Sequence, residues 1–233
     1  MQTELDTWFQ GRAGAYLLRQ ERAVLNEVLP TAFGFYLLQA GAWGSAHGLL
    51  QSSPIRSRMV LDLQADDADL RADPAHLPFA SDSVDTVVLP HTLERTLDPH
   101  QALRETERVL LGEGHLIVLG FHPWGPWGLR QQFAASPPWG GRYISAGRLR
   151  EWLAVLGFET LYIRNYLFRP PFTHDALLVK SGFLDRWRWR LTAGAYMLAA
   201  RKRVLCVTPL RRQRVHPQRA FAGIIKPSTR GMG

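Results

Sequence analysis

Short apolar runs alternate with amphipathic helix patterns along most of the chain, and this alternation limits the class of fold. The runs are rich in Val and Leu at neighbouring positions, as in strands that are covered on both faces. They lie at residues 33–40, 56–63, 83–90 and 114–121. Helix patterns surround them at residues 5–29, 44–52, 98–111 and 145–158. Strands that alternate with helices in this way predict an α/β fold with a mainly parallel sheet.

The ends of two predicted helices are marked by local signals. Asp98 and Ser145 stand where a side chain can cap the first turn, and Pro99 suits the first helical position. Two further apolar segments, 159–168 and 194–203, follow the last helix with no clear helix pattern between them. We expect these two segments to form an antiparallel pair at one edge of the sheet.

Composition is that of a globular protein with a sizeable core. Of 233 residues, 46% are hydrophobic and 21% are charged. No run approaches the roughly 20 apolar residues of a membrane span, and the first residues lack the pattern of a secretion signal. The single Cys206 excludes an internal disulfide and a cysteine-based zinc site, so no metal is expected. We expect a cytoplasmic protein with a helical segment at 1–30, a main domain at 31–203 and a tail at 204–233.

The net charge of +8 comes from the end of the chain. Nine Lys or Arg residues and no Asp or Glu lie from Arg201 onward, which leaves the first 200 residues close to neutral. Such a basic tail can bind the phosphate backbone of a nucleic acid or another anionic surface. A solvated end of the chain accounts for the same charges, so both interpretations stay open.

Polar and glycine residues follow the first two predicted strands. Ligands of open α/β sheets bind at the carboxyl ends of the strands. Gln39, Gly41 and Gly44 follow the first strand, and glycines let the backbone approach a ligand closely. Asp62 ends the second strand, 18 residues after Gly44, where a carboxylate can accept hydrogen bonds from a ribose. A simple strand-to-helix turn and a solvated acid are the alternatives.

The stretch "DPAHLPFASDSVDTVVLPHTLE" at 73–94 is the most specific in the chain. It resembles the Asp-Ala-x-x-Leu-Pro-Phe segment and the following strand of class I S-adenosylmethionine-dependent methyltransferases that act on small molecules. The likeness covers about residues 33–165. The chain also resembles a group of bacterial methyltransferase-like proteins with an altered glycine motif, through "LLQ-G-WG", "LPHTLE" and "GF-P-GLR". This resemblance implies a Rossmann-like, seven-stranded, mainly parallel sheet with helices on both faces, an antiparallel edge hairpin and S-adenosylmethionine as cofactor.

The resemblance also implies roles for individual residues. Gly41 and Gly44 would pack against the methionine part of the cofactor, and Asp62 would hold the ribose. The adenine amino group would be read by Asp73 and the backbone around Ala75 and His76. Pro90 and His91 would line the far side of the methionine, near the transferred methyl group.

Two residues depart from the family pattern at the glycine turn. Gln39 replaces an acidic residue, so it can form hydrogen bonds with the cofactor's amino group but offers no charge. Trp43 stands where a glycine is expected, and it hinders close backbone approach unless its ring points away.

Several groups are candidates for the remaining chemistry. His91 is the candidate general base, with His122 as a second, and a structural hydrogen-bonding role is the alternative for each. The loop at 122–141, rich in Trp, Pro and Gly, is either a lid over an apolar acceptor or a packed surface loop. Arg and Trp alternate at 186–190, a pattern that fits either base stacking or simple packing.

Three functions are consistent with these patterns. The first is a methyltransferase that moves a methyl group directly from S-adenosylmethionine to a small organic acceptor. The second is a non-catalytic binding protein that kept the fold, favoured by Gln39 and Trp43. The third is an RNA or protein methyltransferase anchored by its basic tail. The acceptor and the oligomeric state are not encoded in any recognisable pattern.

Overall fold

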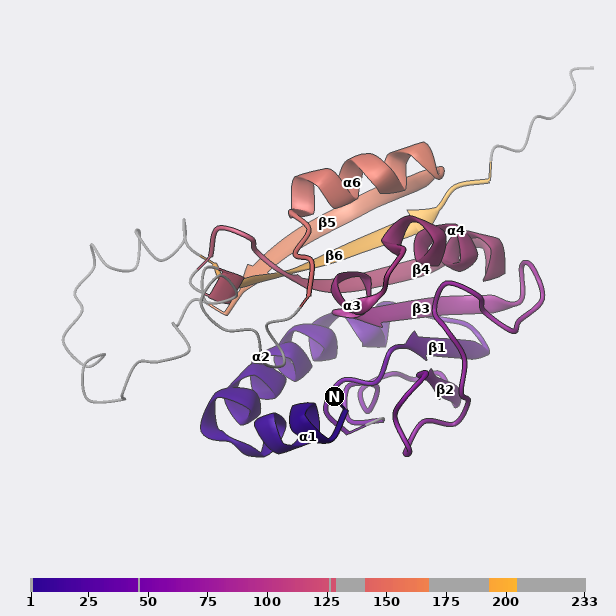
Figure 1. The fold of residues 1–233 in the computed structure, drawn as a ribbon. Helices are drawn as coiled ribbons and strands as arrows, with labels where there is room; N and C mark the ends of the chain where they lie inside the picture. Colours follow the sequence, from indigo (N-terminus) through magenta and orange to yellow (C-terminus); the bar gives the residue numbers. More distant parts are fainter. Residues whose placement is uncertain (1, 46, 126, 129–140, 168–192, 205–233) are drawn as a thin grey trace, which may run out of the picture.

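A parallel sheet extended by an antiparallel edge pair forms the centre of the computed structural model, which describes residues 2–45, 47–125, 127–128, 141–167 and 193–204 (Figure 1). Its strands are β1 (Tyr36–Ala40), β2 (Ser57–Leu61), β3 (Val84–Pro90), β4 (Leu110–Phe121), β5 (Phe158–Tyr166) and β6 (Ala195–Lys202). They lie in the order β2-β1-β3-β4-β6-β5. Strands β1 to β4 are parallel, and β6 runs antiparallel to both β4 and β5. The predicted fold class and edge pair are confirmed.

The strand count is smaller than the resemblance implies. The described residues form six strands, and a single parallel bridge between Leu61 and Leu70 stands beside β2, where a further strand would lie. The segment around Leu70 is rich in aspartates, and Asp69 turns its carboxylate back to accept from the Val60 N–H at 2.7 Å. Because the Val60 N–H donates to this side chain, it is not available to a backbone carbonyl of a regular neighbouring strand.

Helices cover both faces of the sheet (Figure 1). They are α1 (Gln2–Gln10), α2 (Arg12–Val28), the 3-10 turn η1 (Leu29–Thr31), α3 (Thr92–Arg95), α4 (Pro99–Val109) and α6 (Ala146–Val155). Neighbouring strand residues point to opposite faces. One hydrophobic cluster therefore joins Leu37 and Ile117 to α1 and α2, and the other joins Leu38 and Leu116 to α4 and α6.

Two helix starts are set by the side-chain caps that the sequence predicts. The Asp98 carboxylate accepts from the Gln101 N–H at 2.9 Å at the start of α4, and Ser145 Oγ accepts from the Arg148 N–H at 3.3 Å at the start of α6. Both predicted caps are therefore present. The helix predicted over 5–29 is instead two helices, because Gly11 is extended (φ −72°, ψ 162°).

The helix predicted at 44–52 is absent. The described residues of this segment form turns, with Gly44 in the left-handed region at φ +69°. A glycine with positive φ cannot continue a right-handed helix. The polypeptide between β1 and β2 therefore presents a turn, and no helix N-terminus, at the edge of the sheet.

Candidate active site

The carboxyl ends of β1, β2 and β3 bring most of the predicted site residues to one edge of the sheet. The Gly41 N–H donates to the Leu61 carbonyl at 2.7 Å, which holds the turn after β1 against the end of β2. The His91 N–H donates to the Leu119 carbonyl at 3.0 Å, which holds the end of β3 against β4. This edge therefore carries Gln39, Gly41, Asp62, Pro90 and His91.

The two glycines of the turn make room for the chain's own side chains. A Cβ atom on Gly41 would lie 2.5 Å from Thr92 Oγ1, and one on Gly44 would lie 2.8 Å from Leu18 Cδ2. Gly41 also has a positive φ of +102°. The Thr92 hydroxyl donates to the Ala40 carbonyl, which fixes α3 directly over the turn. Gly41 and Gly44 thus allow α3 and α2 to pack tightly on the turn.

Asp62 binds three backbone groups. One carboxylate oxygen accepts from the Ala42 N–H at 2.8 Å, and the other accepts from the Gln64 and Ala65 N–H groups at 2.8 and 2.9 Å. A carboxylate has about four lone-pair sites, so most of its capacity is used. Asp62 is only 7% exposed. In this conformation it organises the turns after β1 and β2.

Gln39 keeps a free acceptor at the centre of the edge. Its side chain is fully buried, and Nε2 donates to the Gly41 carbonyl at 3.0 Å. Among the described residues, Gln39 Oε1 has no hydrogen-bond partner. A buried polar atom without a partner costs about 1–3 kcal/mol, so this oxygen is suited to accept from a bound donor.

His91 lies between two buried glutamates. Its ring nitrogens are 2.8 Å from Glu21 Oε1 and 2.8 Å from Glu94 Oε2. All three side chains are at most 5% exposed. Two carboxylate partners require both ring nitrogens to donate, which only the imidazolium form can do.

The pKa values of His91 and Glu94 are both raised in this group. Burial alone lowers the pKa of His91, but the charge of Glu94 and the hydrogen bonds to both glutamates raise it to about 9. Burial also raises the pKa of Glu94, although its contacts with His91 and the Phe121 N–H oppose this shift. The raised pKa of His91 favours its imidazolium form at neutral pH.

Trp43 packs inside this group. Its side chain is 1% exposed, and Nε1 donates to Glu21 Oε2 at 2.7 Å. The indole stacks on the His91 ring, with 4.3 Å between ring centroids. The ring therefore points inward, where it closes the space between α2 and the end of β3.

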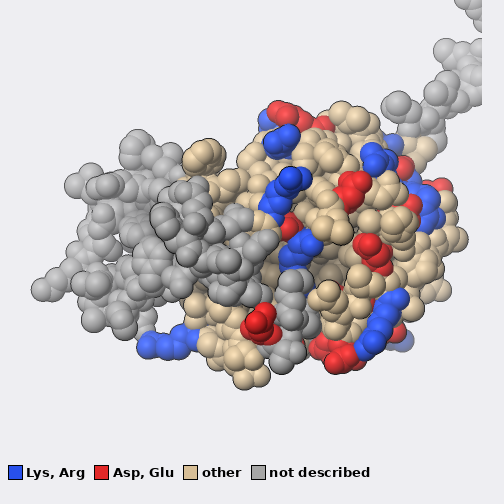
Figure 2. All heavy atoms as spheres, viewed as in Figure 1, with Lys and Arg blue, Asp and Glu red and all other residues tan. Residues whose placement is uncertain are grey.

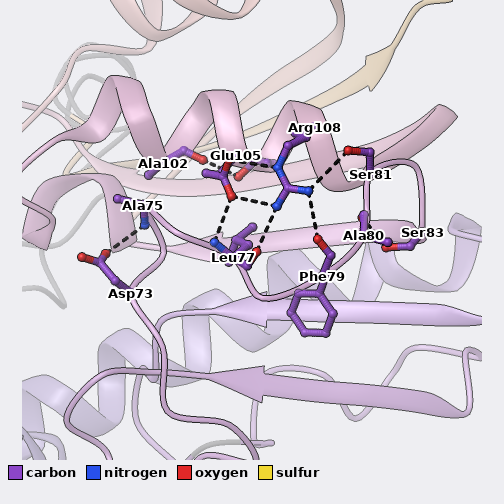
Figure 3. A network of polar contacts seen from close by, with 11 residues as sticks. Asp73, Ala75, Leu77, Phe79, Ala80, Ser81, Ser83, Ala102, Glu105 and Arg108 are labelled. Carbon is purple, nitrogen blue, oxygen red and sulfur yellow. Dashed lines mark hydrogen bonds and ion pairs between the residues drawn. The ribbon is translucent and has the colours of Figure 1, made fainter.

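The segment after the Leu61–Leu70 bridge is held from α4 (Figure 3). The Arg108 guanidinium donates to the Leu77 and Phe79 carbonyls, both at 2.9 Å, and Glu105 Oε2 accepts from the Leu77 N–H at 3.0 Å. The hydrogen bond from Arg108, although partly offset by burial, lowers the pKa of Glu105. The LPF part of the motif is thus fixed by hydrogen bonds from its backbone to Arg108 and Glu105 of one helix.

The polar residues that precede this anchor are accessible. Asp73 Oδ1 accepts from the Ala75 N–H at 2.9 Å, and the side chains of Asp73 and His76 are 44% and 77% exposed (Figure 3). Ala75 itself is buried. The Asp73 carboxylate is therefore available to a ligand, in contrast to that of Asp62.

Sequence reasoning missed Glu21, Glu94, Thr92 and the Glu105–Arg108 pair. Glu21 lies four residues after Leu17 and four before Leu25, on the apolar stripe of α2. An acidic residue on the apolar face of a predicted helix indicates that its carboxylate has a buried polar partner. The second candidate base, His122, is 3.0 Å from Asn165 Oδ1. Most of the 122–141 loop and all of 186–190 lie outside the described residues. Within the described residues, no group of potential metal ligands was found.

The comparisons with known proteins agree with this arrangement of strands. The family profile described as "Methyltransferase domain" matches residues 50–118. The uncharacterized protein YafS of Escherichia coli is 34% identical over 160 residues, which cover 67% of this chain and 66% of YafS. The chain thus spans just under two thirds of that relative. An uncharacterized protein of Mycobacterium tuberculosis is 28% identical over 200 residues, covering 77% of this chain and 68% of that protein.

Solved structures share the fold at low identity. A SAM-dependent methyltransferase of Thermotoga maritima, named a possible histamine N-methyltransferase, has a TM-score of 0.65 at 16% identity and covers 86% of this chain and 96% of its own. Geranyl diphosphate C-methyltransferase of Streptomyces coelicolor has a TM-score of 0.57 at 16% identity, covering 79% and 77%. Residues 50–118 therefore match a methyltransferase domain, and the described part of the chain has the fold of S-adenosylmethionine-dependent methyltransferases.

Proposed function

We propose that this protein uses S-adenosylmethionine to methylate a small organic acceptor by direct transfer. The bound cofactor supplies a methyl group on a sulfonium, which an acceptor atom can attack in line without a covalent enzyme intermediate. The protein's task in such a reaction is to orient the two partners and exclude water. The Streptomyces coelicolor relative in fold was solved with S-adenosyl-L-homocysteine and geranyl diphosphate, which supports this choice of cofactor.

The observation that carries the proposal is the unpartnered Gln39 Oε1. It is a buried acceptor at the edge where the parallel strands end, and a ligand with an amino group would satisfy it. The exposed Asp73 carboxylate offers a second contact on the neighbouring segment. We propose that the cofactor is held by the residues that the family resemblance assigns to it: Gln39, Gly41, Gly44, Asp62, Asp73, Ala75, His76, Pro90 and His91.

The role of His91 as a general base stays a prediction. A general base must be unprotonated, and a pKa of about 9 leaves His91 mostly protonated at pH 7. Both ring nitrogens also have carboxylate partners. If His91 is the base, the rate of methyl transfer will rise with pH up to about 9. Transfer to an acceptor that carries no proton needs no base at all.

A second candidate function is a non-catalytic binding protein with the methyltransferase fold. Three observations favour it: Asp62 is engaged by three backbone N–H groups, Thr92 lies over Gly41, and Trp43 fills the space beside His91. For the cofactor to reach the turn, these groups must rearrange. Direct measurement of cofactor binding separates the two functions.

Thermal unfolding in the presence of S-adenosylhomocysteine tests the role of Gln39. We expect the ligand to raise the Tm of the wild-type protein, because it binds only the folded state. Gln39→Leu, which removes the acceptor, is expected to lose most of this increase. Gln51→Leu alters an exposed turn residue and serves as the matched control.

The same experiment distinguishes the two candidate functions. An increase in Tm that is equal in wild type and both variants would show that Gln39 does not contact the ligand. No increase in the wild type at millimolar ligand would favour the non-catalytic protein. Residence in the cytoplasm stays a prediction; within the described ranges, no helix is long and apolar enough to cross a membrane.

A further inference from the structure

A cleft of about 650 Å³ opens between the starts of α4 and α6 and the segment that follows β4. It lies on the face opposite to α2 and is separate from the buried group around His91. Two arginines and several aromatic rings dominate its lining. The lining residues that the inference uses are His100, Trp124, Arg142, Tyr143, Arg148 and Trp152.

The described lining residues carry a net positive charge. Arg142 and Arg148 are both exposed, and neither guanidinium forms an ion pair with a carboxylate of the described residues. Asp98 is the one acid among the described lining residues, and its carboxylate faces the start of α4, where it accepts from the Gln101 N–H. Figure 2 shows several Lys and Arg side chains below the position of α6, with Asp or Glu side chains between and beside them.

The first turn of α6 adds to this charge. Ser145 Oγ accepts from one of its backbone N–H groups, that of Arg148. A Cβ atom on Gly147 would meet no atom within 4 Å, so the space beside this turn is open. The unpaired N–H groups of a helix start carry partial positive charge, which here reinforces the two arginines.

Aromatic rings form part of the lining of the cleft. The His100 ring lies 3.8 Å from the Trp152 ring, and the Arg148 guanidinium lies 5.5 Å above the same indole. Trp124 is 82% exposed. An exposed indole in the same lining as Arg148, whose guanidinium already lies over an aromatic face, suits the stacking of another planar group.

The cleft borders the candidate active site. The Arg142 N–H donates to the Glu94 carbonyl at 2.8 Å. The Tyr143 ring is 5.2 Å from the Phe121 ring, which in turn is 4.2 Å from His91. Residues 142 and 143 therefore form the wall between the cleft and the buried His91.

We infer that this cleft binds a small planar organic anion, of the class of aromatic carboxylates. The carboxylate would form charge-assisted hydrogen bonds with Arg142 and Arg148, and the ring would stack along Trp152 and Trp124. That such an anion is also the methyl acceptor rests on the proposed function. Its binding does not, because no residue of the proposed cofactor site lines the cleft.

Calorimetry without any cofactor tests the inference, with 2-naphthoate as the probe. The neutral 2-naphthamide tests the need for charge, and cyclohexanecarboxylate tests the need for a planar ring. We expect 2-naphthoate to bind at least tenfold more tightly than either analogue. Arg142→Gln and Arg148→Gln should each weaken its binding about tenfold, in line with the loss of a hydrogen bond to a charged group.

Arg150→Gln is the matched control, because Arg150 is exposed on α6 but does not line the cleft. It should leave the binding of 2-naphthoate unchanged. The inference is overturned if 2-naphthoate does not bind, if the amide binds equally well, or if Arg150→Gln weakens binding as much as the other two substitutions. A failure of S-adenosylmethionine to bind would leave this result untouched and would count only against the proposed function.

Discussion

At the scale of single residues, the group formed by Glu21, His91 and Glu94 is the least ordinary feature of the protein. Ionised groups are rarely buried unless they are paired, because removal from water is costly. Here an imidazolium is paired with two carboxylates, and Glu94 also accepts from the Phe121 N–H at 2.6 Å. Loss of one partner leaves buried charge without compensation.

Replacement of Glu21 by glutamine should therefore destabilise the fold. Glu21→Gln keeps the size of the side chain but removes a charge from His91 and changes the acceptor for the Trp43 indole. We expect the free energy of unfolding to fall by about 3 kcal/mol, as measured by urea denaturation. Glu151→Gln, at an exposed position of α6, should change it by less than about 0.5 kcal/mol. If both substitutions changed the free energy of unfolding by the same amount, the contacts of Glu21 with His91 and Trp43 would not stabilise the fold.

The raised pKa of His91 makes stability depend on pH. The folded value of about 9 exceeds the ordinary value of 6.5, so protonation favours the folded state. This stabilisation is complete below pH 6.5 and is lost as pH rises through 9. Its upper limit is about 3 kcal/mol. Denaturation at pH 6 and pH 9.5 measures the loss; stability that is unchanged or higher at pH 9.5 would contradict the assignment of an imidazolium.

Local residue roles were predictable from sequence, and long-range ones were not. The caps at Asp98 and Ser145 follow from the residue type and its immediate neighbours. The partners of His91 do not, since Glu21 lies 70 residues away in the sequence. Likewise, the strand pattern correctly placed Asp62 at the carboxyl end of β2, but its three backbone partners depend on how the turns at 42 and 64–65 fold.

At the scale of elements, the anchor between α4 and the LPF segment connects a helix to the exposed Asp73. Arg108 donates to two backbone carbonyls and pairs with Glu105 at 2.8 Å. Because the Arg108 side chain is 35% exposed, the ion pair itself contributes little, and the hydrogen bonds to the carbonyls matter more. This anchor fixes the segment without occupying the Asp73 carboxylate.

Removal of the anchor should loosen the Asp73 segment more than the fold as a whole. We expect Arg108→Ala to lower the free energy of unfolding by about 1–2 kcal/mol and to speed amide hydrogen exchange at Leu77. Arg104→Ala alters the same helix at a side chain that donates to Gln101 within that helix, so it should leave this exchange rate unchanged. Slow exchange at Leu77 in Arg108→Ala would show that Glu105 alone holds the segment.

Secondary structure was predicted well where burial is two-sided and poorly where a turn is shaped by distant groups. Strands β1, β2, β3 and β6 fall within their predicted segments, and the continuous apolar runs of β3 and β6 reflect burial along most of their length. Strand β4 begins at Leu110, four residues before its predicted segment, and β5 begins at Phe158, one residue before. The prediction of a helix at 44–52 was wrong for the described residues of this segment. Gly44 has a positive φ there and lies against the Leu18 side chain of α2. No periodicity in the local sequence reports that contact.

At the scale of the whole molecule, the sheet brings together residues from β1, β2 and β3 while α2 closes over them. The N-terminal helices share one hydrophobic cluster with the sheet, including Leu17, Leu25 and Trp43. The start of the basic tail belongs to the fold as well. Arg201, Lys202 and Arg203 pair with acids that include Glu113, Asp82 and Glu159. Residues 205–233, the rest of the predicted tail, lie outside the described residues.

To bind at this edge of the sheet, S-adenosylmethionine must enter space that the chain's own groups occupy in this structure. Gln39 Oε1 and the Asp73 carboxylate offer contacts, and Thr92, Trp43 and the partners of Asp62 must yield space. The cost of that rearrangement reduces affinity, because binding energy is spent on it.

Calorimetric titration of the full chain with S-adenosylmethionine measures whether the protein binds the cofactor. We predict saturable binding of one cofactor per chain, with an affinity lower than it would be at a preformed site. We also predict that Asp73→Asn reduces the affinity. No detectable binding at millimolar cofactor, in a sample shown to be folded, would contradict the claim that this protein is a methyltransferase.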